Sequence, residues 1–233
     1  MKAQGLAGKP VADIRIDGAG KKVTRSDNCR VSDLSVSSDN LTFTYEAKSL
    51  PYPIDTSYYD NEKHTQADAL SVIPFMDEMN YEGLSVSGLS DGYYGLTIGG
   101  EFIGRFTARE LERGINMALL QNTPQYKQAM KIRQMNEERW LKERKMREFY
   151  WVEYNLMRKT GMLWACNEAA VDTLRKYRPH DIFLQWNGDL WLQYMHKGIR
   201  EDCVNEQQDL VNQIYEQNKP IPLRIEIKKF TDL

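Results

Sequence analysis

Hydrophobic and polar residues alternate along several short stretches of the first half of the chain, which is typical of half-buried β-strands. The clearest are VADIRID at Val11–Asp17 and LTFTYEA at Leu41–Ala47. Further stretches of this kind lie at 31–36, 84–89, 94–98 and 102–106. Turn residues separate them, among them Gly99–Gly100, which favours a hairpin. This half is therefore expected to form an antiparallel sheet or sandwich.

The pattern becomes helical at Thr107. Thr107 and Glu110 have the spacing of a capping box, in which each side chain pairs with the other residue's backbone N–H. Thr123 followed by Pro124 marks a second helix start, and neither proline nor glycine occurs between Pro124 and Lys159. This predicts one long helix or a tight helical pair. Further helices are expected at 167–177 and 202–217, before a closing strand at 223–230.

Strands followed by helices and a last strand predict an α+β fold. With 233 residues, the chain can form one large domain or two small ones. We expect an antiparallel β-sheet or sandwich over residues 1–106. Residues 107–233 are expected to form a helical layer, with one long helix and the closing strand, packed on the sheet as one unit.

Composition excludes several functions. The 31 basic and 33 acidic residues give a net charge of -2, which offers no electrostatic basis for a nucleic-acid partner. No run of about 18 apolar residues occurs, so no membrane span is expected. Three cysteines are too few for a disulfide scaffold. The opening MKAQGLAGKP has no apolar core and is not expected to be a signal peptide.

Two short motifs resemble catalytic signatures but have simpler interpretations. Gly88–Gly92 fits G-x-S-x-G around Ser90, yet a strand is expected after it where a nucleophile elbow needs a helix. We interpret it as a hairpin turn. Asn187–Gly188, between Trp186 and Trp191, is interpreted as another turn. The sequence therefore predicts no catalytic residue.

The histidines are His64, His180 and His196, and none has the spacing of a metal-binding pair. No metal and no cofactor are expected. An alternative is a hydrolase site around His180 and Asp181, which would need both side chains in a cleft beside a nucleophile.

Aromatic residues concentrate in the second half of the chain, where core packing is the favoured interpretation. The alternative is a surface that contacts a sugar ring or a partner domain, because apolar sugar faces stack on aromatic rings. The candidate substrate-binding residues are Trp140, Tyr150, Trp151, Trp186 and Trp191.

Several blocks in a shared order carry a resemblance to a known family, and three of them are the most specific. They are GYYGLTI at 92–98, ELERGINMA at 110–118 and Thr123–Pro124. Over roughly residues 1 to 155 the chain resembles the C-terminal region of bacterial SGNH/GDSL-type hydrolases. That family's nucleophilic serine lies in a Gly-Asp-Ser block and its base in an Asp-x-x-His pair; neither occurs here, so no catalytic residue is transferred.

The resemblance implies a C-terminal accessory region, inactive by itself, that packs on a separate SGNH catalytic domain. That domain would be a serine esterase, acting on carbohydrate-linked acyl groups in a secreted or periplasmic protein. The alternative is a free-standing carbohydrate-binding or protein-interaction module.

Overall fold

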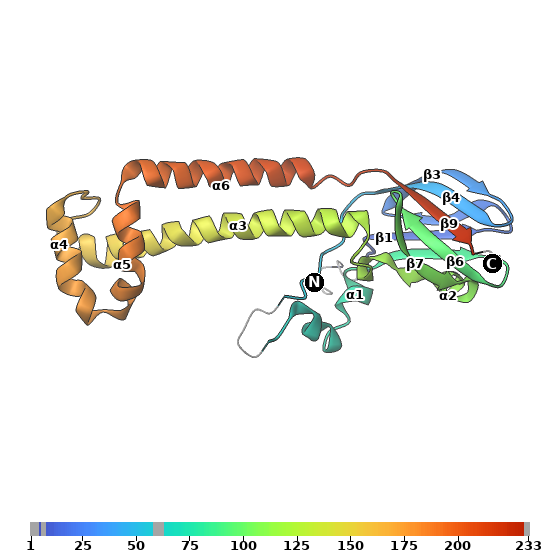
Figure 1. Ribbon diagram of the computed structural model, residues 1–233, viewed down its shortest axis with the longest axis horizontal. Helices are drawn as coiled ribbons and strands as arrows, with labels where there is room; N and C mark the ends of the chain where they lie inside the picture. The colour runs from blue at the N-terminus through green and yellow to red at the C-terminus, as the bar shows by residue number, and fades with distance from the viewer. Residues whose placement is uncertain (1–4, 6–7, 58–62, 231–233) are drawn as a thin grey trace. The chain divides into compact units, whose positions relative to one another are not determined.

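The computed structural model describes residue 5 and residues 8–57 and 63–230 (Figure 1). Most of the opening stretch MKAQGLAGKP lies outside these residues. The chain forms two compact units: a sheet unit, Met1–Ile132 with Gln217–Leu233, and a helical unit, Arg133–Glu216. The α+β class is confirmed. The helix that follows residue 106 packs against a strand of the sheet unit.

The sheet unit contains two sheets, with strand orders β2-β1-β5-β8 and β3-β4-β9-β6-β7. The strands are β1 (Ala12–Asp17), β2 (Lys22–Asp27), β3 (Cys29–Val36), β4 (Asn40–Ala47), β5 (Glu82–Ser87), β6 (Tyr93–Ile98), β7 (Glu101–Thr107), β8 (Ile115–Asn116) and β9 (Leu223–Lys229). Alternate residues of both sheets, such as Ile14 and Phe43, are fully buried in one shared core. In strands such as β1 and β4, burial of one face is the reason that the alternating pattern identified them.

Two pairings depend on residues far apart in sequence. The closing strand β9 is central: Ile227 pairs with Leu41 of β4 on one side and with Leu96 of β6 on the other. Strand β1 pairs with β5 in parallel, with Ile14 opposite Leu84. That parallel pair departs from the antiparallel pattern expected, and it is possible because the chain between the two strands is long enough for a crossover.

Short helices complete the sheet unit. They are η2 (Gln66–Ser71), α1 (Phe75–Glu78), α2 (Ala108–Arg113) and η3 (Met117–Leu119). The capping box is confirmed: Glu110 N donates to Thr107 Oγ1 at 3.1 Å and Thr107 N to Glu110 Oε2 at 2.7 Å. The hairpin at Gly99–Gly100 joins β6 to β7, and both glycines have positive φ, of 60° and 86°.

A carboxylate lies inside this unit. Glu82 is fully buried; Tyr45 Oη donates to its Oε1 at 2.8 Å and Gln125 Nε2 at 3.3 Å. Burial outweighs these hydrogen bonds and raises the pKa of Glu82 to about 7. Oε1 of Gln125 is buried without a hydrogen-bond partner among the residues described.

The helical unit is built on the long helix that the sequence predicted. Its elements are α3 (Pro124–Val152), which enters the unit at Arg133, the π-helical turn η4 (Glu153–Met157), α4 (Glu168–Tyr177), η5 (Arg178–His180), α5 (Ile182–Tyr194) and α6 (Lys197–Gln217). Within the unit α6 runs beside α3 (Figure 1), and Lys142 Nζ lies 2.6 Å from Glu206 Oε2. Phe149, Val152 and Trp191 are fully buried in its core.

Helix α5 contradicts the turn expected at Asn187–Gly188. Asp181 caps it, because its Oδ1 accepts from the backbone N–H groups of Phe183 at 2.8 Å and Leu184 at 3.2 Å. Gly188 lets Arg178 approach the helix closely, since a Cβ there would lie 3.2 Å from Arg178 Nε. Arg178 in turn donates to both carboxylate oxygens of Asp189, at 2.6 and 2.7 Å. The glycine is thus a close-packing position within a helix.

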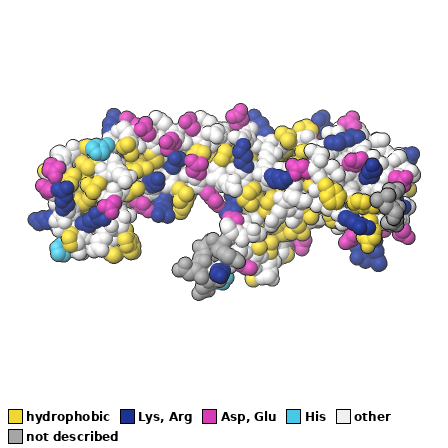
Figure 2. Space-filling view, in the orientation of Figure 1, with side chains coloured by type: hydrophobic (Ala, Val, Ile, Leu, Met, Phe, Trp, Pro, Cys, Tyr) yellow, Lys and Arg dark blue, Asp and Glu magenta, His cyan; other side chains and the backbone are white. Residues whose placement is uncertain are grey.

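Acidic and basic side chains intermingle on the face drawn in Figure 2, with hydrophobic ones exposed among them. Along α3 they form pairs four residues apart, such as Arg139–Glu143 at 3.0 Å and Arg144–Glu148 at 2.8 Å. Within the described residues no helix is sufficiently long and apolar to cross a membrane.

Candidate functional site

Ser90 lies on the connection from β5 to β6, which belong to different sheets. The connection is therefore not the hairpin expected, although a strand does follow it. Lys229 Nζ donates to Ser90 Oγ at 2.8 Å, and Tyr94 Oη lies 3.1 Å from the same oxygen. Ammonium and phenol groups thus surround this hydroxyl.

The five candidate aromatic residues belong to the helical unit but have different surroundings. Trp191 is fully buried, and its surface is not available to a ligand. Trp140 is 45% exposed beneath the Arg147 guanidinium. The other three, Tyr150, Trp151 and Trp186, lie at or near two pockets.

We call the first of these the Trp151 pocket. It has a volume of about 350 Å³, within the range of small-molecule sites. The end of α3, η4 and the η5–α5 junction supply its walls. Its lining residues are Trp151, Asn155, Leu156, Lys159, Thr160, Tyr177, His180, Asp181 and Leu184. An aromatic face, an ammonium and an imidazole therefore share one concavity with a carboxylate.

The π-helical turn orients one wall of this pocket. The N–H of Arg158 donates to the carbonyl of Glu153, five residues earlier, at 2.8 Å, and such turns are frequent at functional sites. Glu153 is buried and anchors the turn. Its carboxylate accepts from Trp191 Nε1 and from the backbone N of Trp164, both at 2.8 Å.

Another part of the lining depends on the cap of α5. Asp181 Oδ1 accepts hydrogen bonds from backbone N–H groups of α5. These bonds fix the backbone of Asp181, and that of the neighbouring His180, in the lining of the pocket. Aromatic rings continue outward from there. The Trp151 ring centroid is 5.2 Å from that of Phe183, which is 5.5 Å from that of Trp186. Trp186 is 67% exposed, so the row ends in solvent.

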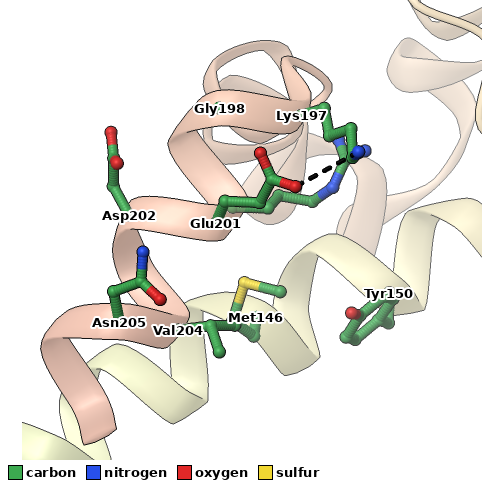
Figure 3. Close-up of a pocket in the computed structure, with 9 residues that line it drawn as sticks. Met146, Tyr150, Lys197, Gly198, Glu201, Asp202, Val204 and Asn205 are labelled. Carbon is green, nitrogen blue, oxygen red and sulfur yellow. Dashed lines mark ion pairs between the residues drawn. The ribbon is translucent and has the colours of Figure 1, made fainter.

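A second pocket, of about 560 Å³, lies between α3 and the first turns of α6 (Figure 3). Met146 and Tyr150 form its floor on α3, and Tyr150 is 38% exposed. Its other wall is mainly charged, and Lys197 Nζ pairs with Glu201 Oε1 at 3.2 Å. Opposite charges on one wall give this pocket no clear preference for an anion or a cation.

Sequence reasoning named His180 and Asp181 as one candidate site and Trp151 as a separate candidate, and it did not bring Trp151 together with the other two. It missed Lys159 and Tyr177, because they carry no motif. One signal was available: an aspartate after Pro179, before an apolar stretch, is a helix N-cap pattern. The three cysteines are free, and in the part of the chain that the structure describes no three His, Cys, Asp or Glu residues are grouped as metal ligands.

Comparisons with known proteins bear on the same helices. Residues 130–219 match the family model described as the diltiazem deacetylase C-terminal helical domain. A solved structure described as a gut microbial diltiazem-metabolizing enzyme superimposes with a TM-score of 0.91 and 36% sequence identity. The match covers 98% of this chain and 52% of that one, so the chain spans about half the length of that enzyme. No curated protein matches the chain.

These matches overturn the resemblance inferred from sequence. The SGNH/GDSL assignment and its accessory-domain role are wrong, and a carbohydrate-binding module has no support either. The blocks that suggested them are short, and they include a β-strand, part of a short helix and a Thr-Pro helix start, which many unrelated folds share. The helices around the Trp151 pocket are instead similar to the C-terminal helical domain of diltiazem deacetylase.

Proposed function

We propose that this chain is part of a deacetylase and that the Trp151 pocket binds the acetylated small-molecule substrate. The observation that carries the proposal is the position of the pocket: every residue that lines it lies within 130–219, the part similar to the diltiazem deacetylase domain. The similar solved enzyme metabolises diltiazem, which makes that compound the natural first probe.

The chemistry of the pocket supports binding of an aromatic ester. A flat ring can stack on Trp151, and an offset or edge-on contact between aromatic groups contributes about 0.5–1.5 kcal/mol beyond burial. Lys159 and His180 provide hydrogen-bond donors in the lining, where they can orient an ester carbonyl. In small-molecule sites, polar groups placed beside apolar and aromatic surface fix the orientation of the ligand.

Titration of the chain with diltiazem by isothermal calorimetry tests this. We expect saturable binding that Trp151→Ala weakens about tenfold or more, while Tyr215→Ala, on an exposed aromatic of α6, leaves it unchanged. Absence of saturable binding, or equal effects of the two substitutions, would refute the proposed site. Far-UV circular dichroism of both variants separates lost binding from lost fold.

One observation favours a second function, hydrolysis in the pocket itself. His180 lines the same concavity as Lys159, so an imidazole could accept a proton from water while an ammonium stabilises the oxyanion. Acetate release from diltiazem by this chain would support it, provided that His180→Asn abolishes the release. Binding without acetate release would leave the chain with the binding role alone.

A further inference from the structure

A thiol and an imidazole meet on the helical unit outside both pockets. Cys166 Sγ lies 3.3 Å from His196 Nδ1, and both residues are exposed. They are thirty residues apart in sequence, and the sequence alone gave no reason to pair them. Neither residue lines the Trp151 pocket or the pocket of Figure 3.

Both residues are held by their neighbours. Cys166 directly precedes Asn167, the N-cap of α4, whose Oδ1 accepts from Ala170 N at 3.0 Å. Upstream, Trp164 N donates to the buried Glu153, which fixes the approach to Cys166. The thiol therefore has a defined position at the start of a ten-residue helix, where the helix dipole favours negative charge.

His196 sits at the corner between α5 and α6. Arg200 Nη1 donates to the carbonyls of Tyr194 at 2.5 Å and Met195 at 2.8 Å, and these bonds hold the corner. The imidazole therefore needs little reorganisation to stay against the thiol. Low reorganisation is what makes a neighbouring base effective in activating a nucleophile.

We propose that Cys166 and His196 form a reactive-thiol site that exchanges with low-molecular-weight disulfides. As Sγ attacks one sulfur of the disulfide, its proton passes to Nδ1 of His196, which is free to accept it in the Nε2-protonated tautomer. The new S–S bond forms while the old one breaks, and the second sulfur leaves as a thiolate. The Cys166 sulfur is oxidised to the disulfide level, and the leaving sulfur is reduced to the thiolate level by the same formal one-electron change.

The other two cysteines provide internal references. Cys29 and Cys203 are buried, and burial raises the pKa of the Cys29 thiol. Both are therefore expected to react slowly. The inference does not depend on the proposed deacetylase function, since the pair lies outside the Trp151 pocket.

Reaction of the native chain with excess dithiodipyridine tests the proposal, because each exchange releases a coloured thione. We expect one fast phase, which peptide mapping assigns to Cys166. It should be about tenfold or more faster than the reaction of N-acetylcysteine, because His196 takes up the thiol proton as Sγ attacks. Cys166→Ser should remove the phase, and His196→Gln should slow it by a similar factor.

Denaturant supplies the control for fold. In concentrated guanidinium chloride the wild type and His196→Gln should react at the same rate, because the imidazole is then remote from the thiol. A native Cys166 that reacts no faster than N-acetylcysteine would overturn the proposal. So would a fast phase that His196→Gln leaves unchanged while circular dichroism shows a folded protein.

Discussion

Trp191 donates its indole N–H to the carboxylate of Glu153 across 2.8 Å, and both residues are buried in the helical unit. The pair links α5 to the π-helical turn that follows α3. The carboxylate would otherwise be a buried acceptor with only the backbone of Trp164 as partner, so the geometry of the Trp151 pocket depends on an indole that never contacts solvent.

Trp191→Phe should destabilise the helical unit by about 1–3 kcal/mol, because it leaves one buried carboxylate oxygen without its donor. Trp186→Phe is the matched control: Trp186 lies on the same helix but is 67% exposed, and its effect should stay within about 0.5 kcal/mol. Guanidinium unfolding followed by circular dichroism measures both. Equal effects would mean that the indole–carboxylate bond contributes nothing.

The sheet unit should be less stable in mildly alkaline than in mildly acidic solution because of Glu82. Its pKa is raised from the usual 4.5 to about 7 by burial. Burial favours protonated Glu82 in the folded state, and this protonation stabilises the sheet unit. The stabilisation is complete below about pH 4.5, the usual pKa, and is lost as the pH rises through the raised pKa of about 7. The largest loss is about 3 kcal/mol, at about 1.4 kcal/mol for each pKa unit.

Glu82→Gln isolates this effect, since other groups titrate in both proteins. We expect the difference in unfolding free energy between pH 5 and pH 8 to be smaller in the variant by up to about 3 kcal/mol. Glutamine can still accept from Tyr45 Oη, and its amide can donate to the buried Oε1 of Gln125 that lacks a partner among the described residues. The same pH dependence in both proteins would contradict the assignment.

Gly188→Ala should destabilise the helical unit by about 1 kcal/mol, although alanine is the better helix former. The new Cβ would press on Arg178, which cannot retreat without weakening its two bonds to Asp189. Gly198→Ala is the contrasting control, because a Cβ there meets nothing within 4 Å. It should stabilise by a few tenths to about 1 kcal/mol. Thermal unfolding of both variants gives the two signs.

Thr107→Ala should cost about 1 kcal/mol, because the backbone N–H of Glu110 loses the hydroxyl that accepts it. Thr107→Ser retains a hydroxyl at the same position and should preserve most of the stability. Denaturant midpoints of the two variants provide the measurement. Comparable losses would show that the Thr107 methyl group, rather than its hydroxyl, stabilises the start of α2.

The capping box and the glycine turn were predictable because each is made by residues no more than four apart. Thr107 and Glu110 satisfy each other's backbone groups whatever the rest of the chain does. The hairpin at Gly99–Gly100 needs positive φ angles, which glycine adopts without steric cost. The same reasoning from neighbouring residues predicted a turn at Asn187–Gly188. Gly188 instead lies inside helix α5, where the lack of a side chain lets Arg178 approach closely.

The sequence by itself determined the α+β class, most strand positions and the long helix, since hydrophobic period and capping groups act over a few residues. Tertiary structure decided which residues become neighbours: β9 lies between β4 and β6, β1 is parallel to β5, His180 lines one pocket with Trp151, and Cys166 lies against His196. These neighbours are brought together by burial of side chains from distant segments. The cost of closing the chain between such segments grows only slowly with its length, so spacing along the sequence carries almost no record of them.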